Sequence, residues 1–145
     1  MSRIVVSVEI DRTPEQVWAD VRHVASHATW MQDAEEIRFL TERTEGVGTR
    51  FECDTRVGPI TLTDVMEITA WDEAQRMGVV HSGLVTGTGE FTLTPRAGGR
   101  TAFRWEEELH FPWWLGGPVG EVVGARVLKL IWRANLRRLK RRLEA

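Results

Sequence analysis

A carboxylate among aromatic residues is the first feature of this sequence that could carry chemistry. In "TAFRWEEELHF", alternate residues of a strand share one face, which groups Glu107 with Phe103, Trp105, Leu109 and Phe111. An unpaired charge there would be costly, so we expect Glu107 to be paired or protonated. It would serve as a polar ligand anchor or as a general acid/base. The alternative is a bulge in the three-glutamate run that turns Glu107 to solvent.

Two further polar residues fall on the inward faces of neighbouring strands. His81 and Asp64 would join Glu107 in a cluster that orients a ligand in an apolar pocket. The alternatives are a core histidine with satisfied hydrogen bonds at position 81, and a slip of the alternation near Val65. Arg126, in the last helix, would pair with Glu107, hold an acidic ligand group, or extend to the rim. Glu107, His81 and Arg126 are the catalytic candidates if the protein is an enzyme.

The same alternation predicts the rest of a cavity wall. The predicted wall residues beyond those above are Phe51, Cys53, Leu62, Met66, Met77, Val79 and Phe91 in the strands, Trp113 and Trp114 after the last strand, and Val123, Val127 and Leu130 in the last helix. Gly87 and Gly89 either leave floor space for a ligand or permit sheet bending.

The tryptophan pair follows a strand end. Pro112 cannot donate to a strand ladder, so it ends the strand, and "GGP" allows the chain to reverse into a helix. We expect one of Trp113 and Trp114 to close the cavity end and the other to be a partly exposed gate. The alternative is that both cap the core.

Other kinds of site find little support. His23 and His27 lie four residues apart without a third ligand, so we expect surface residues and no metal site. Cys53 is the only cysteine, which excludes an internal disulfide, and its apolar strand setting argues against a thiolate nucleophile. Neither a glycine-rich phosphate loop nor a G-x-S-x-G motif occurs, and we expect no cofactor.

The periodicity predicts the order of elements. "RIVVSVEID" alternates as a strand, and Thr13, Pro14 and Gln16 start a helix. A second short helix is predicted in "ASHATWM", with Ser26 as its cap. Six strands follow, in "EIRFL", "TRFECDTRV", "TLTDVMEITAW", "RMGVVHSG", "VTGTGEFTLTPR" and "RTAFRWEEELHF", and then a long helix after Gly117.

The long helix carries two apolar stripes. We expect the first to face the sheet; it comprises Val119, Val123, Val127, Leu130 and Ala134. The second lies opposite, at Leu128, Trp132, Leu136, Leu139 and Leu143. It would be buried by the twist of the helix over the sheet edge, or would contact a second copy or transiently a membrane, for which the basic "RRLKRR" suits anionic head groups.

Composition sets the class of protein. The 145 residues, 28% charged and 42% hydrophobic, predict a single globular domain over 1–145. Residues 1–120 carry 11 Lys and Arg against 19 Asp and Glu, and residues 121–145 carry 8 against 2. The basic end is either a solvated helix face or a surface for an anionic partner. No apolar run reaches the length of about 20 that spans a bilayer, and no signal peptide is evident, so we expect a cytoplasmic protein. No sheet face combines aromatic and basic residues, so we expect no nucleic acid partner.

A curved antiparallel sheet of seven strands has a concave face, and only the last helix is long enough to cover it. The predicted fold is α+β, with the sheet wrapped around this helix, two short helices after the first strand, and a cavity where helix and sheet part.

The sequence resembles the SRPBCC superfamily, which includes START lipid-transfer domains, birch-pollen-allergen-like proteins and the polyketide cyclase/dehydrase and lipid-transport family. The matching segments are "IDRTPEQVWADV", "WM" at Trp30 and Met31, "GVGTRFECDTRVG" and "ANLRRLKRRLE", and the similarity covers the whole chain. The resemblance implies a helix-grip fold with a hydrophobic ligand cavity. It says little about activity, because the superfamily shares no single catalytic motif.

Three functions follow as hypotheses. The first is binding, with transport or sequestration, of a small lipid-like or polyketide-like molecule. The second is an aromatase/cyclase-type enzyme that uses polar pocket residues to move protons. The third is a protein-interaction module with a vestigial pocket. The sequence leaves monomer and homodimer open.

Overall fold

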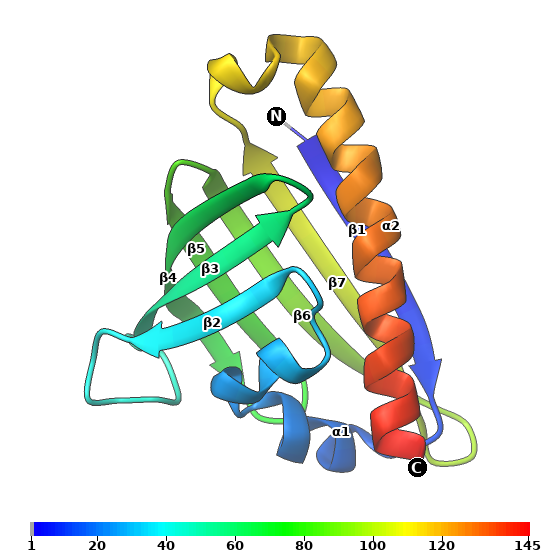
Figure 1. The fold of residues 1–145 in the computed structure, drawn as a ribbon. Coiled ribbons are helices and arrows are strands. Elements are labelled where there is room, and N and C mark those ends of the chain that lie inside the picture. Colours follow the sequence, from blue (N-terminus) through cyan, green and yellow to red (C-terminus); the bar gives the residue numbers. More distant parts are fainter. Residues whose placement is uncertain (1) are drawn as a thin grey trace.

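Seven antiparallel strands form one curved sheet, and a long helix lies along it (Figure 1). The computed structural model describes residues 2–145. The elements are β1 (Ser2–Ile10), α1 (Pro14–Val21), η1 (Val24–Thr29), β2 (Ala34–Phe39), β3 (Arg50–Val57), β4 (Ile60–Asp72), β5 (Arg76–Gly83), β6 (Thr86–Arg96), β7 (Arg100–His110), η2 (Trp113–Leu115) and α2 (Gly117–Glu144). The strand order is β1-β7-β6-β5-β4-β3-β2, so β1 and β2 are the two edges. This is the α+β architecture expected from the sequence.

The first short helix begins as its sequence predicts. The Thr13 hydroxyl accepts from the Gln16 amide at 3.3 Å, and the Gln16 side chain accepts from the Thr13 amide at 2.9 Å. The predicted cap of the second short helix is wrong. η1 is a 3-10 helix with His23 at its N-cap, and the Ser26 hydroxyl instead donates to the His23 carbonyl at 2.7 Å.

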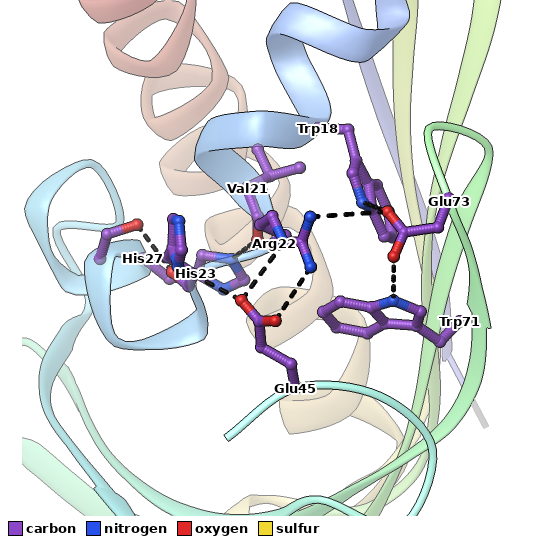
Figure 2. A network of polar contacts seen from close by, with 9 residues as sticks. Trp18, Val21, Arg22, His23, His27, Glu45, Trp71 and Glu73 are labelled. Carbon is purple, nitrogen blue, oxygen red and sulfur yellow. Dashed lines mark hydrogen bonds and ion pairs between the residues drawn. The ribbon is translucent and has the colours of Figure 1, made fainter. Parts of the chain in front are cut away.

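Figure 2 shows how the end of α1 is tied to two connections of the sheet. Arg22 donates to both carboxylate oxygens of Glu45, at 3.2 and 2.9 Å. The Glu73 carboxylate accepts from the indole N–H groups of Trp18 and Trp71, whose rings meet edge to face at 5.0 Å. These contacts hold α1, and η1 after it, against one end of the sheet.

The side-chain alternation of β4 holds through Asp64. The register of β4 against β5 shifts between Ile68 and Ala70, beyond the slip considered near Val65. Asp64 is therefore on the inward face and is buried.

The orientation expected for the last helix is wrong. The first stripe does not pack on the sheet; of the alternatives for the second stripe, burial in the core is the one observed, at Trp132, Leu136 and Leu139. The Trp132 ring stacks on Trp105, with centroids 4.4 Å apart and an interplanar angle of 15°. The physical reason is area: a tryptophan and leucines remove more apolar surface from water than the valine stripe does.

A polar clamp fixes the same face of the helix. Asp33, just before β2, accepts from the Trp132 indole N–H at 3.1 Å and from the Asn135 amide at 2.7 Å. The Asn135 side-chain oxygen in turn accepts from the Gln32 backbone amide at 3.0 Å. Asp33 and Asn135 are buried, so these bonds are made away from water. The second half of α2 therefore has one allowed rotation against the sheet.

The first turns of α2 are held differently: the Ser2 hydroxyl of β1 donates to the Glu121 carboxylate at 3.0 Å in a part-buried hydrogen bond. The chain reverses through Gly116 and Gly117, both with positive φ, and a Cβ at Gly120 would lie 1.9 Å from the Leu115 carbonyl oxygen. η2 therefore folds back closely on the start of α2. Val119 and Leu130, expected against the sheet, are 74% and 66% exposed.

We expect Asn135→Ala to lower the free energy of unfolding by about 1–3 kcal/mol, because Asp33 and the Gln32 amide each lose a buried partner. Urea denaturation measures this change. Arg133→Ala, on the exposed face of the same helix, is the control and should stay within about 0.5 kcal/mol of the parent chain. Equal losses in the two variants would show that the clamp does not hold α2.

Candidate functional site

A cavity of about 440 Å³ lies between the sheet and the first half of α2. This volume is within the range of small-molecule sites. Side chains from η1, from β2 to β7 and from α2 form its wall, and most of them are apolar. The buried bonds of Asp33 hold the second half of α2, and the cavity borders mainly the first half.

Most predicted wall residues lie where the alternation places them. The wall includes Phe51, Cys53, Leu62, Asp64, Met66, Met77, Val79, His81, Phe91, Trp105, Glu107 and Leu109 from the strands, and Val123 and Val127 from α2. The inward orientation of Glu107 is confirmed, since β7 pairs with β1 and β6 without a register shift at this position.

Three predicted residues from the last strand and helix are not on the wall. Phe103 is fully buried and packs against Phe91 in the core beyond the cavity, with ring centroids 5.1 Å apart. Arg126 and Leu130 are exposed to solvent. The observed rotation of α2 turns a different set of residues toward the cavity, namely Gly120, Gly124 and Leu128. Arg126 is consequently neither a partner of Glu107 nor a catalytic candidate.

The two tryptophans neither close the cavity nor cap the core. Trp113 is 84% exposed and Trp114 is 52% exposed, and it is their neighbour Leu115 that reaches the cavity wall. η2 stands out at the end of the molecule where α2 begins (Figure 1), which leaves both rings in water. Contact of an exposed tryptophan at this end with a membrane stays a prediction.

The cavity also contains residues that the sequence did not indicate. Among them are Val24, His27, Met31, Asp33, Ala34 and Ile37, from η1, the segment after it and β2. For two of them the sequence held a signal: Val24 and His27 are three residues apart, which places both side chains on one side of a helical turn.

His27 corrects the expectation of a surface histidine. It is buried, its Nε2–H donates to the Val21 carbonyl at 2.7 Å, and burial lowers its pKa to about 4. It is therefore neutral near pH 7. Cys53, also on the wall, has its pKa raised by burial to about 11, which keeps it a thiol.

The polar centre of the cavity is a pair formed by His81 and Glu107. His81 Nε2 lies 2.7 Å from Glu107 Oε1, and each side chain is more than nine-tenths buried. His81 is on β5 and Glu107 is on β7, so the glutamate must reach across β6. A Cβ at Gly89, its register partner on β6, would lie 2.5 Å from Glu107 Oε1. The missing side chain of Gly89 is thus the space that the carboxylate occupies.

Charge within this cluster changes the acidity of its members. Burial alone would lower the pKa of His81, but the hydrogen bond and charge of Glu107, with the charge of Asp64, outweigh it and raise the pKa above 6.5. Burial is also the main cause that raises the pKa of Asp64, and the charge of Glu107 adds to it. The site therefore holds a histidine that favours the protonated form next to a carboxyl group that is harder to ionise.

Two atoms of the cluster have no hydrogen-bond partner within residues 2–145. They are His81 Nδ1 and Asp64 Oδ1, both buried on residues that line the cavity. Buried polar atoms without partners are rare in folded proteins and call for an explanation. A polar group of a bound molecule would supply the missing bonds.

Residues 2–145 contain no group of three His, Cys, Asp or Glu side chains placed to hold a metal ion. Within the same residues, no helix is long and apolar enough to cross a membrane.

The chain matches, over residues 1–144, the family described as polyketide cyclase/dehydrase and lipid transport. It belongs to this family. Among curated protein sequences, none matches the chain. The comparison therefore continues with solved structures.

Solved structures of similar fold come from several bacteria. The TTHA0849 protein of Thermus thermophilus is 14% identical, with a TM-score of 0.85 over 98% of this chain and 97% of that one. The Zhui aromatase/cyclase of Streptomyces sp. R1128 is 16% identical, with a TM-score of 0.81 over 99% and 93%. A START superfamily protein of Mycobacterium smegmatis is 13% identical, with a TM-score of 0.76 over 98% and 97%. At these identities the likeness shows the fold alone.

We expect Gly89→Ala to move the Glu107 carboxylate away from His81, because the new methyl group would take its place. The pKa of His81 should then fall, since burial would no longer be opposed by the hydrogen bond. An NMR titration of the imidazole ring measures this pKa. Glu107→Gln should lower it as well, and Gly124→Ala, where a methyl group meets open space, should leave it unchanged. An unaltered pKa in Gly89→Ala would contradict the positioning role.

His27 should make the protein sensitive to mild acid. Its pKa is about 4 in the folded protein and 6.5 when exposed, so the unfolded chain binds the extra proton as the pH falls through this interval. Between pH 7 and pH 5 the loss of stability from this residue is about 2 kcal/mol. Urea denaturation of the parent chain and His27→Gln at both pH values isolates it, because the other titrating groups are shared. The same pH dependence in both proteins would contradict the assignment.

Proposed function

We propose that this protein binds a small, mostly apolar molecule in the cavity between the sheet and α2. The observation that carries the proposal is the pairing of a 440 Å³ apolar cavity with two unpartnered polar atoms on its wall. Ligand sites commonly combine an apolar lining with a few convergent polar groups that fix orientation.

The cavity is larger than the voids that imperfect packing usually leaves in a protein interior. Protein interiors are close-packed, and voids larger than a water molecule are few in a domain. The buried apolar residues of α2 are Trp132, Leu136 and Leu139, all in its second half, and the first half borders the cavity. This argues against the interaction module with a vestigial pocket, which would require the space to be filled by side chains.

The family description and the neighbouring structures support the class of ligand. One neighbour is an aromatase/cyclase and another belongs to the START superfamily, and the family name includes lipid transport. These names support a lipid-like or polyketide-like molecule that is carried or sequestered by this chain.

Catalysis is the second candidate function, and the His81–Glu107 pair favours it. A histidine whose protonation is tuned by a buried carboxylate is suited to donate or accept a proton during a cyclisation or dehydration. Turnover that is lost in Glu107→Gln while ligand binding persists would place the protein in this class.

Filling the cavity from α2 tests the binding proposal. Gly124 lies on the wall, and a Cβ added there would have no other atom within 4 Å, so Gly124→Leu would project into the hollow from a helical position that tolerates leucine. We expect affinity for the neutral dye Nile red, followed by fluorescence, to fall by about 10-fold or more, because the ligand loses its volume.

Val122→Leu is the matched control, since residue 122 is exposed on the same helix and lies outside the wall. It should bind the dye as the parent chain does. Native mass spectrometry of the purified protein should in addition detect a co-purified small molecule, which solvent extraction would identify. Unchanged dye binding in Gly124→Leu would refute the cavity as the binding site.

A further inference from the structure

We infer that the polar end of the bound molecule is a neutral hydroxyl group, held by Asp64 and His81. This inference rests on the proposed function and adds the chemical class of the ligand to it. It starts from the two unpartnered atoms, Asp64 Oδ1 and His81 Nδ1.

The sheet register brings the two residues together. Asp64 pairs with Gly83 and Met66 pairs with His81 across β4 and β5, so Asp64 and His81 are diagonal neighbours on one face. Each affects the acidity of the other, and both line the cavity. One end of one ligand can therefore reach both side chains.

The other acidic residues of the wall are engaged by side chains, whereas the Asp64 carboxylate accepts from the Val85 backbone amide and its Oδ1 has no partner. The Asp33 carboxylate accepts from Trp132 and Asn135, and Glu90 accepts from Arg76 at 3.3 Å. Glu107 Oε1 is bonded to His81 Nε2. Of the unpartnered buried atoms in the described residues, those of Asp64 and His81 belong to the cavity wall, and those of Trp30 and Thr49 do not.

A hydroxyl group suits these atoms in each protonation state. Because the Glu107 carboxylate can only accept, His81 Nε2 carries a proton, and Nδ1 is then a donor in the imidazolium and an acceptor in the neutral ring. A hydroxyl can accept from the first and donate to the second. It can also donate to an ionised Asp64 oxygen. A ketone or ether oxygen cannot donate, so it would leave Asp64 unsatisfied.

Charged ligand ends fit less well. A carboxylate would lie beside Asp64 and Glu107, and like charges at short range in a buried site repel strongly. An ammonium group would lose its water shell in an apolar cavity and would meet a histidine that favours its own positive charge. The cluster therefore selects a neutral donor–acceptor group.

The test compares four molecules with one two-ring skeleton: naphthalene, 2-naphthol, 2-naphthoate and 2-naphthylmethylammonium. Isothermal titration calorimetry with the parent chain gives their dissociation constants. We expect 2-naphthol to bind about 10-fold more tightly than naphthalene, as one or two hydrogen bonds to a charged group would provide, and both ions to bind more weakly than 2-naphthol.

Asp64→Leu removes the acceptor and keeps an apolar wall. It should reduce the preference for 2-naphthol over naphthalene to about 3-fold or less while naphthalene binds as before, which shows that the cavity is intact. Val65→Leu, at the neighbouring position of β4 and outside the cavity wall, is the control and should keep the full preference. Three results would overturn the hydroxyl assignment and leave the cavity proposal standing. They are equal binding of 2-naphthol and naphthalene to the parent chain, tighter binding of either ion than of 2-naphthol, and an undiminished preference in Asp64→Leu. Failure of all four molecules to bind would overturn both.

Discussion

The clamp between Asp33 and α2 determines where this molecule has a core and where it has a cavity. Asp33 immediately precedes β2, one edge of the sheet, and the helix it holds packs along β1, the other edge. α2 therefore bridges both edges at one end of the sheet, where the core is continuous. Toward the other end the helix is joined to β1 by the Ser2–Glu121 hydrogen bond, and the cavity lies between the helix and the strands.

The cavity places titratable groups where water is scarce, which opposes folding. His81 and Glu107 offset part of this cost by pairing with each other, but Asp64 Oδ1 and His81 Nδ1 stay unsatisfied within residues 2–145. A core selected for stability alone would carry apolar residues at these positions. Their presence in an otherwise apolar wall is the feature on which the proposed ligand binding, and the alternative of proton transfer, both depend.

The strands were predicted well because their period of two has few competing interpretations. Once the boundaries were known within a residue or two, the alternation placed Glu107, His81 and Asp64 on the inward face. Their mutual contact could not be predicted with the same ease. It depends on β6 lying between β5 and β7 and on Gly89 lying opposite Glu107, which only the sheet order and register reveal.

The helix was harder because α2 offers two apolar stripes, and periodicity alone does not say which one meets the sheet. The available signal was Asn135, a polar residue within the leucine stripe, which implies a buried partner. That partner, Asp33, is 102 residues away in sequence. The exposed tryptophans were misplaced for the same reason, since their position follows from how the start of α2 leaves the sheet.

The two halves of α2 are under different structural constraints. Substitutions among Trp132, Asn135 and Leu136 disturb the core, whereas Val123, Gly124 and Val127 touch little besides the hollow. Substitutions at Val123, Gly124 or Val127 change the volume of the cavity and have little effect on the free energy of unfolding. Under the proposed function, the choice of ligand can therefore change at positions that the folded core does not depend on.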